Sequence, residues 1–166
     1  MYYSSFGALA IVLHFIINYD FLKKTSRDQT TIVRTRYRYF LFGIVLYYVS
    51  DVLWGMLHEL RIVPLVYADT VLYFFSMVLS VLLWTRFVVV YLDVKKGFSR
   101  FLIYAGWAIF TYELIMLIVN FFIPVVFYFN EAGDYFPHQA RYITLATQTL
   151  LFFISSVCIM LKTSIA

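Results

Sequence analysis

Five stretches of this sequence are each long and apolar enough to cross a lipid bilayer as an α-helix, which needs about 20 mainly apolar residues. They cover residues 3–22, 39–62, 69–92, 101–127 and 142–161. Continuous apolar stretches favour helices over the short alternating runs that form membrane β-strands. The pattern therefore predicts an all-α fold, a polytopic integral membrane bundle of about five transmembrane helices. Residues 1–166 would form a single transmembrane domain.

The composition supports a lipid environment. The chain is 63% hydrophobic and only 13% charged, whereas a soluble domain carries about 25% charged residues. The net charge of +4 does not indicate nucleic-acid binding, because the basic residues cluster beside the apolar stretches. The expected partner is the lipid bilayer. Cys158 is the single cysteine, so the chain cannot form an internal disulfide.

The positive charges predict an orientation. Ten of the 13 Lys and Arg residues lie after the first, third and fifth apolar stretches, whereas Arg61 and Arg141 lie on the opposite side. Lys and Arg concentrate in the cytoplasmic loops of membrane proteins. We therefore expect the N-terminus outside and the C-terminus inside.

The outer connections are expected to be a tight turn at residues 61–68 and a longer polar loop at residues 128–141. Asp69 is positioned to cap the N-terminus of the third helix, since a carboxylate there accepts from free backbone N–H groups. Pro124 lies within the long fourth stretch and is expected to bend that helix.

Four polar residues on four different predicted helices lie at nearly the same depth: Asp51, Ser80, Glu113 and Gln148. Each is about 18–20 Å above the inner end of its helix, at 1.5 Å per residue. One interpretation is a shared cavity, in which Asp51 and Glu113 hold a proton, a cation or an amine. The other is that each group is satisfied locally, by its own helix or a neighbouring one.

The second apolar stretch has a polar and aromatic face. Tyr47, Asp51, Trp54 and His58 are spaced by four, three and four residues, which places them on one side of a helix. This face either lines a pocket open to the outside or packs against other helices. The candidate ligand-binding residues are therefore Asp51, Trp54, His58, Ser80, Glu113 and Gln148. The sequence predicts no metal site, assigns no cofactor and contains no recognised catalytic motif.

Three short motifs support a resemblance to a known group of proteins: Ser50–Gly55 (SDVLWG), Ala68–Thr70 (ADT) and Leu83–Arg86 (LWTR). Together with the opening residues they resemble the N-terminal membrane regions of bacterial signalling proteins, chiefly from Firmicutes. In that group, a multi-helix membrane region precedes a cytoplasmic GGDEF (diguanylate cyclase) or related output domain. The chain itself contains no GGDEF motif.

The resemblance implies a multi-pass protein of the bacterial inner membrane that acts as a homodimer when coupled to an output domain. It also implies that the chain is the sensory part of a longer protein, cut before further helices or the output domain. We therefore expect a module that receives a small ligand or cation and passes a helix movement to a C-terminal domain. The alternative is a small-solute or proton-coupled carrier that uses Asp51 and Glu113.

Overall fold

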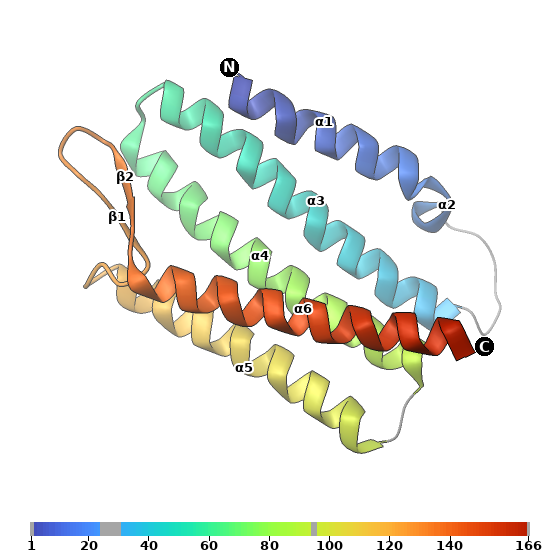
Figure 1. The fold of residues 1–166 in the computed structure, drawn as a ribbon. Helices are drawn as coiled ribbons and strands as arrows, with labels where there is room; N and C mark the ends of the chain where they lie inside the picture. The colour runs from blue at the N-terminus through green and yellow to red at the C-terminus, as the bar shows by residue number, and fades with distance from the viewer. Residues whose placement is uncertain (1, 24–30, 94–95, 166) are drawn as a thin grey trace.

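The computed structural model describes residues 2–23, 31–93 and 96–165. Within these ranges the chain forms six α-helices and one β-hairpin (Figure 1). The elements are α1 (Tyr2–Ile17), α2 (Tyr19–Leu22), α3 (Thr31–Glu59), α4 (Val63–Leu92), α5 (Lys96–Asn120), β1 (Phe127–Phe129), β2 (Tyr135–Pro137) and α6 (Gln139–Ile165). The expected all-α class is confirmed, with one hairpin that the sequence analysis does not predict.

Four of the described helices are long and apolar enough to cross a membrane. They are Ile32–Glu59, Val63–Leu92, Gly97–Asn120 and Gln139–Leu161. The first expected span instead forms a helix of 16 residues, or about 24 Å, which is shorter than the roughly 30 Å hydrocarbon core of a bilayer. The chain therefore has the helices of a membrane protein, while the fifth span and the orientation remain predictions.

The first apolar stretch is interrupted at Asn18. Its backbone N–H and its side-chain Nδ2 both donate to the carbonyl of His14, at 3.1 and 3.0 Å. The Tyr37 hydroxyl donates to Asn18 Oδ1 at 3.2 Å. A side chain that bonds to the carbonyl four residues back competes with the regular backbone pattern of a helix. The continuous helix expected over residues 3–22 is therefore wrong at this point.

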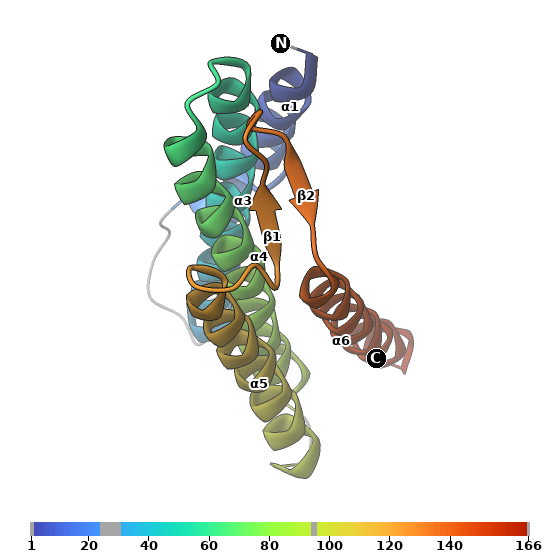
Figure 2. The ribbon, with the colours of Figure 1, turned by 90° about the vertical axis from the view of Figure 1, so that its left-hand side faces the viewer.

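Helix α4 is the centre of the fold. It packs against α3, α5 and α6, whereas α1 packs against α3. Helices α1, α3, α4 and α5 form one layer (Figure 1), and α6 lies on one side of that layer (Figure 2). Two glycines allow close approach to α4: an added Cβ would lie 3.0 Å from Ser80 Oγ at Gly43 and 2.5 Å from Thr85 Oγ1 at Gly106. Small residues at such contacts let helix backbones pack tightly.

The turn between α3 and α4 is shorter than expected. Helix α4 begins at Val63 with a proline in its first turn, a position that proline favours because its missing N–H is not needed there. Asp69 therefore lies inside the helix, is 6% exposed and accepts a hydrogen bond from Ser50 Oγ at 3.1 Å. The predictions of a turn over residues 61–68 and of an Asp69 N-cap are wrong.

Helix α5 ends at Asn120, not near residue 127, so Pro124 lies in the irregular connection to β1 and does not bend a helix. The expected outer loop instead contains the hairpin, in which Phe127 pairs with Pro137 and Phe129 with Tyr135. The Phe127 side chain is fully buried and stacks on Phe74 of α4, with ring centroids 5.8 Å apart. This contact holds the hairpin against the central helix.

Candidate functional site

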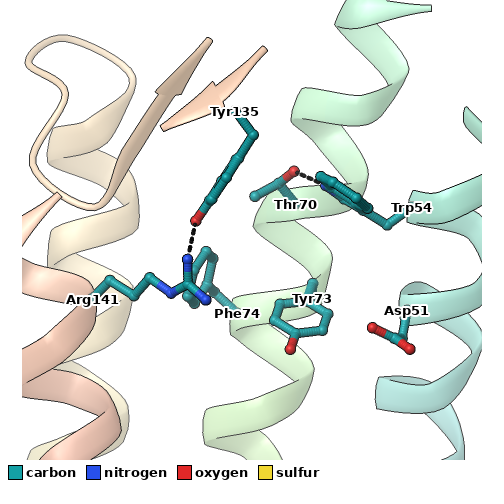
Figure 3. A pocket seen from close by; sticks show the side chains of 7 residues that line it. All are labelled: Asp51, Trp54, Thr70, Tyr73, Phe74, Tyr135 and Arg141. Carbon is teal, nitrogen blue, oxygen red and sulfur yellow. Dashed lines mark hydrogen bonds between the residues drawn. The ribbon is translucent and has the colours of Figure 1, made fainter. Parts of the chain in front are cut away.

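A pocket of about 310 Å³ lies at the hairpin end of the bundle. Helix α4 forms its floor, α3 and α6 form its sides, and β2 contributes a side chain from above (Figure 3). Its lining combines aromatic rings with two ionisable groups of opposite charge. The lining residues are Asp51, Trp54, Thr70, Tyr73, Phe74, Tyr135 and Arg141.

The α3 side of the pocket is fixed to α4 by a hydrogen bond. The Trp54 indole N–H donates to Thr70 Oγ1 at 3.0 Å, and that hydroxyl donates to the Val66 carbonyl at 2.7 Å. The indole ring also stacks on the His58 ring, with 4.9 Å between the ring centroids. His58 therefore supports Trp54 and does not line the pocket.

The floor is held by a second contact between α3 and α4. The hydroxyls of Tyr47 and Tyr73 lie 2.8 Å apart, and their ring centroids are 4.9 Å apart. Thr70, Tyr73 and Phe74 are three and four residues apart on α4, so they share the helix face that carries the pocket. The floor thus presents two aromatic rings and one hydroxyl-bearing side chain from a single helix face.

Arg141 lies at one end of the pocket, on the first turn of α6. It donates to the Tyr135 hydroxyl at 3.1 Å, and its guanidinium lies 5.6 Å from the centroid of the Tyr135 ring. Burial raises the pKa of Tyr135, and the Arg141 charge opposes this shift without cancelling it. The phenol is therefore neutral near neutral pH. Among the described residues, no carboxylate lies within ion-pair distance of Arg141.

Asp51 lies at the opposite end of the pocket, on helix α3, which packs against both α1 and α4. A Cβ added to Gly7 of α1 would lie 3.3 Å from Asp51 Oδ2, so the carboxylate lies close against that helix. Asp51 also interacts electrostatically with Asp69 of α4. Figure 3 shows the Asp51 carboxylate on the side of the pocket opposite the Arg141 guanidinium, with Tyr73 and Phe74 between them.

The four residues predicted at one depth have three different surroundings. Asp51 lines the pocket, whereas Ser80 donates to the Ser76 carbonyl at 2.8 Å and faces Gly43. Glu113 of α5 is fully buried, and its Oε2 accepts a hydrogen bond of 2.6 Å from a threonine of α6.

The α5–α6 contact contains two unpaired polar atoms. Thr144 is the donor to Glu113, and Gln148 lies one turn further along the same helix. Glu113 Oε1 and Gln148 Nε2 are both buried and have no hydrogen-bond partner among the described residues. A buried water molecule commonly bridges such atoms. Because α4 lies between α3 and α5 (Figure 1), Glu113 and Asp51 belong to different helix contacts.

Sequence reasoning identifies Asp51 and Trp54 among the seven lining residues. It interprets Arg141 only as an orientation signal. The available signal is the spacing of Thr70, Tyr73 and Phe74 on one helix face. In the part of the chain that the structure describes, no three His, Cys, Asp or Glu side chains come close enough to hold a metal ion.

No protein family, curated protein or solved structure matches this chain. The described residues define the class of the chain: a helical protein in which four of the described helices could cross a membrane.

Proposed function

We propose that this chain is a membrane-embedded, ligand-receiving module whose pocket binds a small zwitterion of the amino-acid type with an apolar or aromatic body. One observation carries the proposal. A guanidinium and a carboxylate lie at opposite ends of an aromatic pocket (Figure 3). Small-molecule sites in proteins are typically apolar cavities with a few placed polar groups that orient the ligand.

The charges favour a ligand with two charged groups. A guanidinium recognises a carboxylate through parallel hydrogen bonds, and Arg141 has no carboxylate partner among the described residues. The Asp51 side would attract an ammonium group, and the nearby Trp54 ring can add a cation–π contribution. An ion carrying only one charge would use only one of the two polar ends of the pocket, whereas a zwitterion would use both.

The pocket also connects elements that could transmit a signal. Arg141 is near the start of α6, which has 27 residues and is about 40 Å long. A ligand that bridges Arg141 and Asp51 would favour a closer position of α6 relative to α3. The far end of α6 would then move as part of the same rigid helix. A ligand shifts such an equilibrium by binding one arrangement more tightly than the other.

The resemblance to GGDEF-type signalling proteins supports an output at the far end of α6. In that proposal the pocket faces the outside of a bacterial inner membrane, and a C-terminal cytoplasmic domain responds to the movement. No observation favours the alternative, a carrier with an Asp51–Glu113 relay, because α4 separates the helices that carry these two residues.

The proposal is tested by three probes that share an indole ring: L-tryptophan, tryptamine and indole-3-propionate. Binding to the purified protein in nanodiscs is measured by calorimetry. We expect L-tryptophan to bind at least about tenfold more tightly than either singly charged probe, because a hydrogen bond to a charged group contributes about 1.5–3 kcal/mol. Equal affinity for all three probes, or no binding of any of them, would contradict the proposal.

Two variants assign the charges. Arg141→Gln should abolish the advantage of L-tryptophan over tryptamine, and Asp51→Asn its advantage over indole-3-propionate. Arg61→Gln is the matched control, because Arg61 is an exposed positive charge in the turn between α3 and α4. If Arg61→Gln weakens binding as much as Arg141→Gln, the effect comes from the general surface charge and not from the pocket.

A further inference from the structure

A second cavity lies at the opposite end of the bundle from the hairpin. It has a volume of about 810 Å³ and is open along one side. Side chains from α2, α3, α4 and α6 line it, whereas α6 itself packs against α4 and α5. The result is a groove between α3 and the C-terminal half of α6, with α4 as its floor. It shares no lining residue with the hairpin-end pocket and is independent of the proposed function.

One wall of this groove is a continuous series of aromatic rings. Phe21 contacts Tyr37, Tyr37 contacts Phe87, and Phe87 contacts Trp84, with centroid separations of 4.9, 4.9 and 5.4 Å. Trp84 then reaches Phe152 of α6 at 5.7 Å. The rings come from four helices, so the wall is a feature of the assembled bundle.

The polar atoms of this wall already have partners within the chain. The Trp84 indole N–H donates to Ser155 Oγ at 2.7 Å, and the Tyr37 hydroxyl donates to Asn18 Oδ1 at 3.2 Å. A ligand therefore meets a surface that behaves as a hydrocarbon, and it gains nothing there by carrying polar groups. The body of a matching ligand is apolar.

The end of the groove near the start of α3 carries one cation, Arg34. Its Nη2 donates to the backbone carbonyls of Asp20 and Lys23, and its guanidinium lies 6.0 Å from the Phe21 ring. These partners are neutral. The Arg34 Nε atom is buried and has no hydrogen-bond partner, and no carboxylate among the described residues lies within ion-pair distance of this side chain.

We propose that this groove binds one anionic membrane phospholipid, with the headgroup phosphate on Arg34 and an acyl chain along the aromatic wall. The groove matches such a molecule. A phospholipid carries an anionic group at one end of an apolar body, and the groove carries Arg34 at one end of an apolar wall. Basic pockets between membrane helices bind anionic headgroups, and a guanidinium is well suited to phosphate oxygens. A free phosphate could use Arg34 but not the wall, and a zwitterionic phospholipid could use the wall with less gain at Arg34.

The test compares dioleoyl phosphatidylglycerol, dioleoyl phosphatidylcholine and sn-glycerol 3-phosphate by native mass spectrometry of the detergent-solubilised protein. We expect phosphatidylglycerol to bind at least about tenfold more tightly than phosphatidylcholine, and glycerol phosphate not to bind measurably. Arg34→Gln should reduce phosphatidylglycerol binding to the phosphatidylcholine level. Its control is Arg100→Gln, because Arg100 is exposed near the start of α5 and does not line the groove.

A second pair of variants tests the acyl-chain part. Ile159→Trp fills the groove from α6 and should reduce binding of both phospholipids, whereas Val157→Trp adds the same ring at a more exposed position on that helix. The proposal is overturned if Arg100→Gln matches Arg34→Gln, if glycerol phosphate binds as well as the lipid, or if filling the groove has no effect. Should Ile159→Trp fail to fold, the comparison of Arg34→Gln with Arg100→Gln still decides the outcome.

Discussion

Asn120 provides the sharpest test of how this fold builds its pocket. Its side-chain oxygen accepts hydrogen bonds from the backbone N–H groups of Val125, Val126 and Phe127, at 2.9, 2.7 and 3.2 Å. Its Nδ2 donates to the Phe127 carbonyl at 3.1 Å. One amide group, 5% exposed, thus organises the segment that connects α5 to the hairpin carrying Tyr135.

Replacing Asn120 by Ala removes these four hydrogen bonds, together with a longer one of 3.4 Å from Nδ2 to the Tyr67 hydroxyl, and leaves three N–H groups without their acceptor. At about 1 kcal/mol for each bond, the local free energy of opening should fall by about 3–4 kcal/mol. This corresponds to an increase of about 100-fold or more in amide exchange at Val125 and Val126. The hairpin would lose its fixed position over α4, so binding at the pocket should weaken although no lining residue has changed.

Hydrogen exchange followed by mass spectrometry measures this effect peptide by peptide. Asn120→Asp is the matched control, because a carboxylate keeps acceptors for the three N–H groups and loses only the Nδ2 donor to Phe127 and Tyr67. We expect the Asp variant to retain most of the protection at Val125 and Val126. The reasoning is refuted if the Ala variant exchanges like the wild type at these amides, or if both variants lose protection equally.

Two further predictions follow from the placement of the charges. The effects of Asp51→Asn and Asp69→Asn on thermal stability should be non-additive, because these two carboxylates interact. The effects of Asp51→Asn and Glu113→Gln should instead add to within about 0.5 kcal/mol, and strong coupling of Asp51 to Glu113 would refute this placement. In a Cys158→Ser background, a cysteine at the exposed Ala132 of the hairpin should react with an impermeant reagent from outside intact cells, and protection there would refute the predicted orientation.

The four long helices are predictable because apolar length is a property of local sequence. Their ends are less predictable, since they depend on single side chains that compete with the backbone. Asn18 and Asn120 each stop a helix inside an apolar stretch by bonding to backbone groups. Hydropathy does not predict the hairpin for a related reason. Its aromatic strands continue the apolar composition of the preceding helix, so hydropathy alone does not separate the strands from that helix.

Depth can be counted from a sequence, but rotation about the helix axis cannot. Asp51 and Glu113 are matched in depth, yet α4 lies between their helices, and Glu113 finds its hydrogen-bond partner on α6. The sequence therefore predicts only two of the residues that line the pocket, Asp51 and Trp54. The charged end of the pocket opposite Asp51 is formed by Arg141. This residue lines the pocket because the hairpin directs the start of α6 over α4.

This dependence distinguishes Arg141 from the buried groups that the fold itself requires. Glu113 and Asp69 each accept a hydrogen bond from a neighbouring helix through one oxygen, and the other oxygen of each is buried without a hydrogen-bond partner among the described residues. Arg141 contacts a neutral phenol, and among the described residues it has no charge to balance it. In the function we propose, the ligand supplies the charge that balances Arg141. On that proposal, the charge preference of the pocket, more than its volume, defines the ligand.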